Sequence, residues 1–318
     1  MIYYTNARLL TMDEGRVIER GFLAVDGSDI AAVGDMSEFP ATISSEDTRI
    51  DLEGATVLPA CIDAHSHLGI FNDSLRDEGD DGNENTDPVT PHLRAVDGIY
   101  HADVCFREAY EGGVGTVMTG PGSANVLGGQ FAILSTYERT VDRAVLKAPA
   151  AQKAAFGENP KTVYGKENKT PTTRMGTAGI LREALFTTAE YMRKCDDYFR
   201  KKKTYDDAVV AGDEDLPDDP DRPDFDFVSE SLLPILRGEI PLKIHAHRQD
   251  DILTAVRICN EFGLIYSLEH CTDGYLIADI LADEYAAGQA PGRGTQNREA
   301  PGGKLLGVVV GPVIGDRS

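Results

Sequence analysis

The sequence lacks any apolar run that approaches the roughly 20 residues needed to span a bilayer. Its first residues lack a charged segment followed by an apolar one, so we expect no signal peptide. The five cysteines are an odd number without CxxC spacing, which argues against a disulfide framework and against a thiolate zinc site. These absences predict a soluble, cytoplasmic protein that does not associate with membranes.

Basic residues are scarce. The 31 Lys and Arg residues face 53 Asp and Glu residues, which gives a formal net charge of −22. This balance argues against nucleic acid and anionic membranes as partners, because phosphate binding requires clustered Lys and Arg. Much of the acidic excess lies at 206–226, which we interpret as a solvated, mobile insertion between helices. A calcium site there is disfavoured, because the spacing does not match an EF-hand loop.

The chain has two kinds of patterning. Residues 1–58 form short alternating runs broken by the turn signals Asp26-Gly27 and Gly34-Asp35, which predicts a small β-rich part. Residues 59–318 alternate strand-like and helix-like segments, which predicts a parallel α/β arrangement. Within it, we expect a strand at 113–120 and a helix from Thr173 to about residue 200, with Thr172 or Thr173 as its cap.

His65 and His67 are the most informative residues. The preceding run Ala55–Leu58 is short, apolar and partly β-branched, so it predicts a buried strand that ends near the histidines. Residues i and i+2 of a strand point to the same face, so both imidazoles would project together. Two neutral imidazoles side by side supply half of a tetrahedral zinc site. The alternative is a pair of ordinary polar residues at a strand end.

Further histidines follow other strand-like runs. His245 and His247 end one such run, and a helix-like stretch from Asp250 to Phe262 comes next. His270 then ends the apolar run that begins at Leu264. Strand ends that carry ligands, each followed by a helix, are typical of the active-site face of a (β/α) barrel.

The segments that carry these histidines resemble the amidohydrolase superfamily. The run PACIDAHSHLG is similar to its HxH signature, and KIHAHRQDD and SLEHCTDG resemble its fifth- and sixth-strand segments. A GENPK segment is similar to one in imidazolonepropionase-like members. The resemblance covers nearly the whole chain. It implies an α/β fold with a TIM-type (β/α) barrel at 59–318, flanked by a small β-sandwich to which residues 1–58 contribute.

The resemblance also implies a ligand set for a divalent metal, Zn²⁺ above all, as one or two ions. His65, His67, His245 and His270 match metal-ligand positions. In some branches a glutamate is a further ligand, whereas in others a carboxylated lysine bridges two metals. Glu158 closes a strand-like stretch and is our preferred choice.

Lys153 is the alternative bridging ligand. It lies deeper on the same stretch and has the opposite strand parity to Glu158. For catalysis the resemblance points to His270 and His247. His247 would be an outer-shell or substrate contact, and a solvated polar residue is the competing interpretation.

One departure from the family concerns its catalytic aspartate at the end of the eighth barrel strand. The last residues, from Leu305 onward, are typical of the seventh strand and the loop that leaves it. We therefore expect an incomplete barrel without the eighth strand, in a truncated and weakly active or inactive family member. Asp316 is a poor substitute, because it lies in a Gly-Asp-Arg-Ser loop.

The function expected from this resemblance is metal-dependent hydrolysis of amide-type C–N bonds, other than ordinary peptide bonds, in a small cyclic or peptide-like molecule. A metal-dependent ring deaminase would use the same ligands. A third hypothesis is a non-catalytic fragment stabilised as a homo-oligomer, because an unpaired edge strand invites association. The expected partners are thus a small-molecule substrate and a second copy of the chain.

Overall fold

The computed structural model describes residues 1–73, 75–290 and 302–311. The chain divides into two compact units, Met1–Cys61 and Ile62–Ser318. Each unit has its own sheet and its own core, so the two are described separately.

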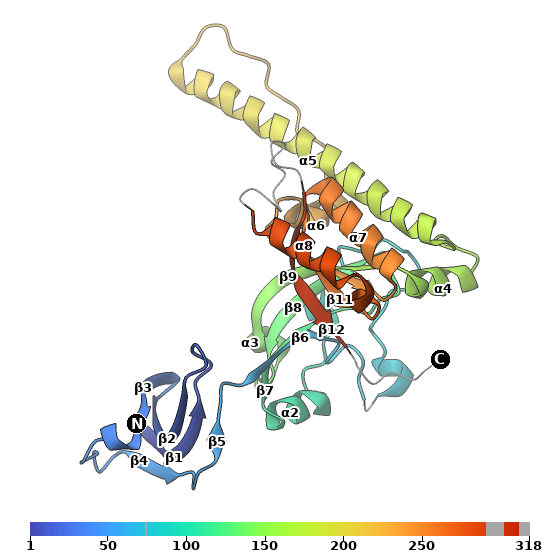
Figure 1. The fold of residues 1–318 in the computed structure, drawn as a ribbon. Coiled ribbons are helices and arrows are strands. Elements are labelled where there is room, and N and C mark those ends of the chain that lie inside the picture. The colour runs from blue at the N-terminus through green and yellow to red at the C-terminus, as the bar shows by residue number, and fades with distance from the viewer. Residues whose placement is uncertain (74, 291–301, 312–318) are drawn as a thin grey trace. The chain divides into compact units, whose positions relative to one another are not determined.

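The N-terminal unit is built on a mixed sheet with the order β3-β2-β1-β4, in which β5 also pairs with β1 (Figure 1). Its strands are β1 (Ile2–Leu10), β2 (Val17–Asp26), β3 (Asp29–Asp35), β4 (Thr48–Asp51) and β5 (Thr56–Val57), and a 3₁₀ turn spans Met36–Glu38. The pairs β1–β2 and β2–β3 are antiparallel, whereas β4 and β5 are parallel to β1. The hairpin predicted at Asp26-Gly27 forms, and Gly27 adopts a φ of 60° in the turn. The turn predicted at Gly34-Asp35 is wrong, because Asp35 instead caps the 3₁₀ turn. These described residues form one five-stranded sheet.

The strand predicted at Ala55–Leu58 has a different role from the one expected. Only Thr56–Val57 is extended, and it pairs with β1 in the N-terminal sheet. Of the two histidines, His65 lies instead on the next strand, β6 (Cys61–Ser66), and His67 directly follows it. The expectation that Ala55–Leu58 is a buried strand is therefore wrong, since none of its residues is buried.

The C-terminal unit is an α/β fold built on a curled seven-stranded sheet with the order β12-β11-β10-β9-β8-β7-β6 (Figure 1). After β6 come β7 (Val114–Thr119), β8 (Leu127–Ser135), β9 (Val145–Ala155), β10 (Leu242–Ala246), β11 (Ile265–His270) and β12 (Lys304–Val310). Strands β9 to β12 are parallel, as predicted. Among the described strands, β6 and β12 are the two edges of the sheet. Closure into a TIM barrel stays a prediction, and Asp316 lies outside the described residues.

Strand β8 corrects the expectation of a wholly parallel arrangement. It is antiparallel to both β7 and β9. The connection 120–126 is too short for a crossover to a parallel strand, which needs about a dozen residues or more. The chain must therefore turn back on itself. Gly128 and Gly129 lie inside this strand.

The helices of this unit are α1 (Ala95–Gly98), α2 (Val104–Glu111), α3 (Val141–Ala144), α4 (Glu158–Lys166), α5 (Arg174–Ala211), α6 (Phe227–Leu236), α7 (Gln249–Phe262) and α8 (Ala278–Gly288), with 3₁₀ turns at Arg76–Gly79 and Gly274–Ile277. Helices α6, α7 and α8 pack against strands β9–β12, whereas the short helices α1, α2 and α3 contact β7 and β8. The 38-residue α5 lies against α6 and α7 (Figure 1). Within the described ranges, no helix is both long enough and apolar enough to cross a membrane.

Helix α5 is longer than the sequence predicted. Thr173 caps its first turn by accepting a hydrogen bond from the Gly176 amide, which decides between the two candidate caps. The helix continues through Ala211 and ends at Gly212, whose φ is 75°. The first part of the predicted insertion at 206–226 is therefore helical. Lys202 binds both Asp206, one turn away, and Asp219 in the following loop.

The main core lies between strands β9–β11 and helices α5–α7. Its fully buried members include many large apolar side chains, among them Leu181, Leu185, Leu232, Ile235, Ile244, Tyr266 and Leu268. A rigid, well-packed layer of this kind fixes the carboxyl ends of the parallel strands. The candidate site is built on those ends.

Candidate functional site

Four histidines from three strands form one cluster. His65 lies on β6 and His67 directly follows it, while His245 and His270 belong to β10 and β11. The ring centroids of His65 and His67 are 5.2 Å apart, those of His65 and His270 are 5.0 Å apart, and those of His245 and His270 are 4.5 Å apart. The structure thus brings together the four imidazoles that the sequence selected.

The backbone of β11 places two neighbouring side chains at this cluster. His245 pairs in register with Glu269, and Ala246 pairs with His270. Regular alternation along a strand would send Glu269 and His270 to opposite faces. His270 has a φ of 67°, a left-handed conformation that is unusual for a residue with a side chain. This local departure from the strand allows His270 to face the other imidazoles, and backbone strain of this kind gathers at functional sites.

The hydrogen bonds of the rings identify which nitrogens are free. Nδ1 of His67 lies 2.7 Å from the carbonyl oxygen of Gly120, and Nδ1 of His270 lies 2.5 Å from that of Gly311. A carbonyl oxygen only accepts, so both Nδ1 atoms donate, and in a neutral ring Nε2 then keeps its lone pair. Nε2 of His65 and both ring nitrogens of His245 are buried without a hydrogen-bond partner among the described residues.

Burial keeps these rings neutral. It lowers the pKa of His65 to about 4 and that of His67 to about 4. Burial also holds the pKa values of His245 and His270 below the ordinary histidine value. Neutral imidazoles are the form that binds metal ions.

Glu269 is a site residue that the sequence reasoning missed. Its side chain is fully buried, and it accepts hydrogen bonds from Nδ1 of His65 at 2.9 Å, Nζ of Lys243 at 2.8 Å and Oγ of Ser267 at 2.5 Å. Burial acts to raise the pKa of Glu269, but the His65 hydrogen bond and the Lys243 charge outweigh it and hold the pKa at about 2. A carboxylate inside the apolar run of β11 was the available signal, because buried glutamates are rare unless paired.

Lys153 lies beside this carboxylate, on β9. It pairs in register with Lys243, its side chain is fully buried, and its Nζ has no hydrogen-bond partner among the described residues. The ammonium lies 5.5 Å from the ring centroid of Phe131. Burial lowers the pKa of Lys153 to about 7. Lys153 therefore places a buried nitrogen, which has no hydrogen-bond partner among the described residues, near Glu269 and His65.

The structure does not bring Glu158 to the histidines. The strand ends at Ala155, Gly157 has a φ of 81°, and Glu158 begins α4. Strand parity therefore cannot be continued to Glu158. Its carboxylate is more than half exposed and forms ion pairs with Lys161 at 3.1 Å and Arg174 at 2.9 Å.

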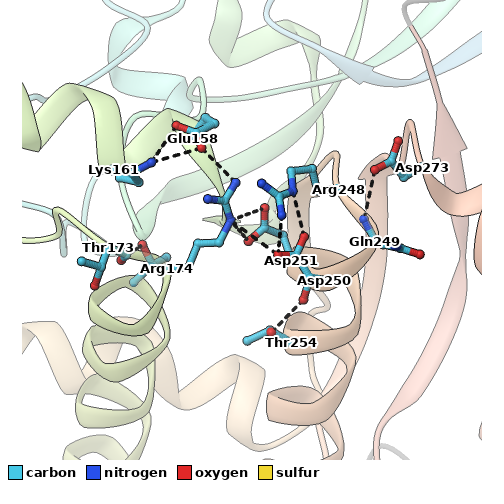
Figure 2. A network of polar contacts seen from close by, with 11 residues as sticks. Glu158, Lys161, Thr173, Arg174, Arg248, Gln249, Asp250, Asp251, Thr254 and Asp273 are labelled. Atoms are coloured by element: carbon cyan, nitrogen blue, oxygen red, sulfur yellow. Dashed lines mark hydrogen bonds and ion pairs between the residues drawn. The ribbon is translucent and has the colours of Figure 1, made fainter.

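Figure 2 shows that Glu158 belongs to a separate polar network. Arg174, at the start of α5, links Glu158 to Asp251 on α7, which it contacts at 3.0 Å. Asp251 is buried, so this ion pair ties α5 to α7 beside the GENPK segment. The arrangement indicates a structural role for Glu158.

His247 lies at the exposed side of the cluster. Its ring centroid is 4.6 Å from that of His245 and 5.2 Å from that of His270, and its Nδ1 lies 2.7 Å from Oγ1 of Thr272. The side chain is exposed, unlike that of His245. It is therefore placed to meet a molecule that enters from solvent.

The long loop after His67 packs against this region. The carbonyl oxygen of Gly82 accepts from the amide of Gly122, and Oδ1 of Asn83 accepts from the amide of Ala124. Gly120, which orients His67, begins the segment that these contacts secure. The loop thus supports the segment that orients His67.

The donor set fits a divalent cation. Two imidazoles on one ion, with metal–nitrogen bonds of about 2.1 Å, place their ring centroids roughly 5 Å apart. The observed centroid separations of 4.5 to 5.2 Å agree with this spacing. In the part of the chain that is described, no three His, Cys, Asp or Glu side chains already meet in ligating geometry. Metal binding would therefore require these side chains to move from the positions seen here.

Comparison with solved structures decides the family. The crystal structure of an amidohydrolase from Thermotoga maritima MSB8 aligns with a TM-score of 0.78 and 35% sequence identity, over 98% of this chain and 70% of that one. This chain belongs to the amidohydrolase superfamily. The resemblance inferred from the HxH, GENPK, HAH and EH segments is confirmed, although no family model matches the sequence.

Curated amidohydrolase relatives match over smaller shares of their length. Amidohydrolase tasK of Hapsidospora irregularis is 31% identical over 258 residues, which cover 77% of this chain and 25% of that protein. An imidazolonepropionase of Roseobacter denitrificans is 43% identical over 68 residues, which cover 20% of this chain and 17% of that protein. The chain thus spans a quarter or less of these two relatives.

Proposed function

We propose that this amidohydrolase is a metal-dependent hydrolase that cleaves an amide-type C–N bond in a small cyclic or peptide-like substrate with activated water. The observation that carries the proposal is the cluster of four neutral imidazoles, because His65 and His245 present buried nitrogens that have no hydrogen-bond partner in the described part of the chain. Buried polar atoms of this kind are costly unless something binds them.

His65, His67, His245 and His270 would hold the ion. When bound, a divalent metal such as Zn²⁺ supplies Lewis acidity, which activates water near neutral pH and polarises a carbonyl group. The carbonyl oxygens of Gly120 and Gly311 fix the orientation of His67 and His270, so their Nε2 atoms stay directed for binding. His247, exposed beside them, would contact the substrate.

Lys153 is the better candidate than Glu158 for the further ligand. Its buried nitrogen lacks a hydrogen-bond partner among the described residues, whereas Glu158 is engaged by Lys161 and Arg174. A neutral lysine amine that attacks CO₂ and loses a proton becomes a carbamate, an anionic oxygen donor. A carbamate on Lys153 would bridge two ions, and an unmodified Lys153 would leave a site for one.

The experiment combines metal analysis with a substrate panel. The metal-free protein is reconstituted with Zn²⁺, and its metal content is measured for the wild type and for His245→Ala, with His92→Ala as a control histidine that has no contact with the cluster rings. We expect one or two ions per chain, lost in His245→Ala and kept in His92→Ala. The reconstituted protein is then assayed on cyclic amides and N-acyl amino acids for hydrolysis, and on amino-substituted rings for ammonia release.

Hydrolysis of the amides supports the proposal. Ammonia release from the rings alone would replace the hydrolase with a deaminase. A wild-type protein that retains no metal would overturn the proposal and favour the non-catalytic hypothesis.

A further inference from the structure

We propose that Glu269 is the positioning residue of His65, and that Lys243 and Ser267 hold Glu269 in place for this role. Glu269 fixes the His65 tautomer that leaves Nε2 free for the ion. This inference rests on the proposed function, since it concerns how that metal site is prepared.

The hydrogen bond between His65 and Glu269 crosses the interior of the curled sheet. The two residues are 204 positions apart in sequence, and β6 and β11 are separated in the sheet by four other strands. No backbone pairing connects these strands among the described residues. The 2.9 Å contact between Nδ1 of His65 and Oε2 of Glu269 is therefore a side-chain link between the first and sixth strands of the unit.

His65 differs from the other oriented histidines in the kind of partner it has. His67 and His270 donate to backbone carbonyl oxygens of Gly120 and Gly311, which their loops hold. His65 depends on a side chain, so its orientation is only as secure as that of Glu269. Carboxylates that accept from a ligating imidazole orient the ring and raise its basicity.

Three contacts restrain the carboxylate itself. Oε2 accepts from His65, while Oε1 accepts from Nζ of Lys243 at 2.8 Å and from Oγ of Ser267 at 2.5 Å. Both oxygens are thereby committed, and the side chain is fully buried. The remaining freedom of Glu269 is small, and its negative charge lies against Nδ1 of His65, on the side of the ring away from the free Nε2.

The test must separate this hydrogen bond from the buried charge pair. Removal of one partner leaves the other as an uncompensated buried charge, whereas replacement of both by groups of similar volume is tolerated. Two double variants meet this need. Glu269→Gln with Lys243→Met, the Gln/Met variant, keeps an amide oxygen that can accept from His65. Glu269→Met with Lys243→Met, the Met/Met variant, removes that acceptor.

The first measurement is the ¹⁵N NMR spectrum of the histidine rings in the metal-free proteins, with the His65 signals assigned by their loss in His65→Asn. We expect the wild type and the Gln/Met variant to carry the His65 proton on Nδ1. In the Met/Met variant we expect the proton to move largely to Nε2.

The second measurement is Zn²⁺ affinity by competition with a chromophoric chelator. We expect the Met/Met variant to bind about 10- to 100-fold more weakly than the Gln/Met variant. Asp251→Asn, which alters a buried carboxylate outside the cluster, is the control and should keep wild-type affinity.

A wild-type His65 that carries its proton on Nε2 would overturn the inference, whether or not the variants fold. Equal tautomers and affinities in the two double variants would overturn it as well. A wild-type protein that binds no zinc, with the tautomer difference intact, would instead overturn the proposed function and leave the positioning role standing.

Discussion

Lys153 lies opposite Lys243 in the register of β9 and β10, and only Lys243 has an ion-pair partner among the described residues. Two buried ammonium groups thus share the neighbourhood of one carboxylate, Glu269. Burial of an unpaired charge is costly, so the arrangement favours a Lys153 that is uncharged or chemically converted to an anion. The four imidazoles lie beside this pair of lysines. An anionic oxygen on Lys153 would join them as a further ligand for a bound metal ion.

The first prediction concerns this lysine. In the presence of ¹³C-labelled bicarbonate and Zn²⁺, we expect a carbamate signal in the ¹³C NMR spectrum of the wild type. Lys153→Met should abolish the signal and lower the metal content to one ion or none. Lys161→Met, which removes an exposed lysine near Glu158, is the control. A signal that survives in Lys153→Met would place the carbamate elsewhere.

The second prediction separates Glu158 from the metal site. Glu158→Gln should leave metal content unchanged, because its carboxylate is engaged by Lys161 and Arg174. The free energy of unfolding should fall by less than about 1 kcal/mol, since exposed ion pairs contribute little. Metal analysis and urea unfolding measure the two effects. Loss of zinc in this variant, with the fold intact, would restore Glu158 as a ligand.

Much of the site could be predicted from the sequence. The histidines follow short apolar runs, and the carboxyl ends of parallel strands meet at one edge of a sheet. Because residues i and i+2 of a strand share a face, the sequence also predicted that His65 and His67 project together. The same rule failed at Glu158, because Gly157 breaks the strand with a φ of 81° and a helix begins one residue later.

Other features depend on strand register, which the local sequence does not determine. The ion pair of Lys243 with Glu269, and the link from Glu269 to His65, join residues on different strands. The inward direction of His270 depends on a single left-handed residue in β11. The antiparallel direction of β8, by contrast, could have been predicted, because the connection 120–126 leaves no room for a crossover helix.

The third prediction concerns the cap of α5. Thr173→Ala should lower the free energy of unfolding by about 1 kcal/mol, because the Thr173 hydroxyl accepts from the otherwise unpaired amide of Gly176. Thr172→Ala is the matched control, because Thr173 and not Thr172 caps the helix, and it should leave the free energy of unfolding nearly unchanged. Urea denaturation followed by circular dichroism compares the two. Equal losses in both variants would contradict the assignment of the cap.

The fourth prediction concerns Gly157. A Cβ atom there would lie 2.6 Å from Oδ2 of Asp251, on top of the strain of a φ of 81°. Gly212, with a φ of 75° and a ψ of 29°, lies in the ordinary left-handed region and has no described atom within 4 Å of such a Cβ, so it is the milder reference.

Gly212→Ala should therefore cost about 1 kcal/mol of unfolding free energy. Gly157→Ala should cost about 1–3 kcal/mol more, because the contact with Asp251 must be relieved and because a ψ of −137° at positive φ strains any residue with a side chain. Thermal or urea unfolding of the two variants gives the comparison. A Gly157→Ala protein as stable as Gly212→Ala would contradict this prediction.

The most direct test of the account is X-ray absorption spectroscopy of the zinc-reconstituted chain, in the wild type and in His245→Ala. The account predicts a first shell of nitrogen and oxygen donors near about 2.0–2.1 Å, with strong imidazole scattering that weakens in His245→Ala. A shell dominated by sulfur near about 2.3 Å, or an imidazole signal unaffected by the variant, would contradict a centre built from these three strands.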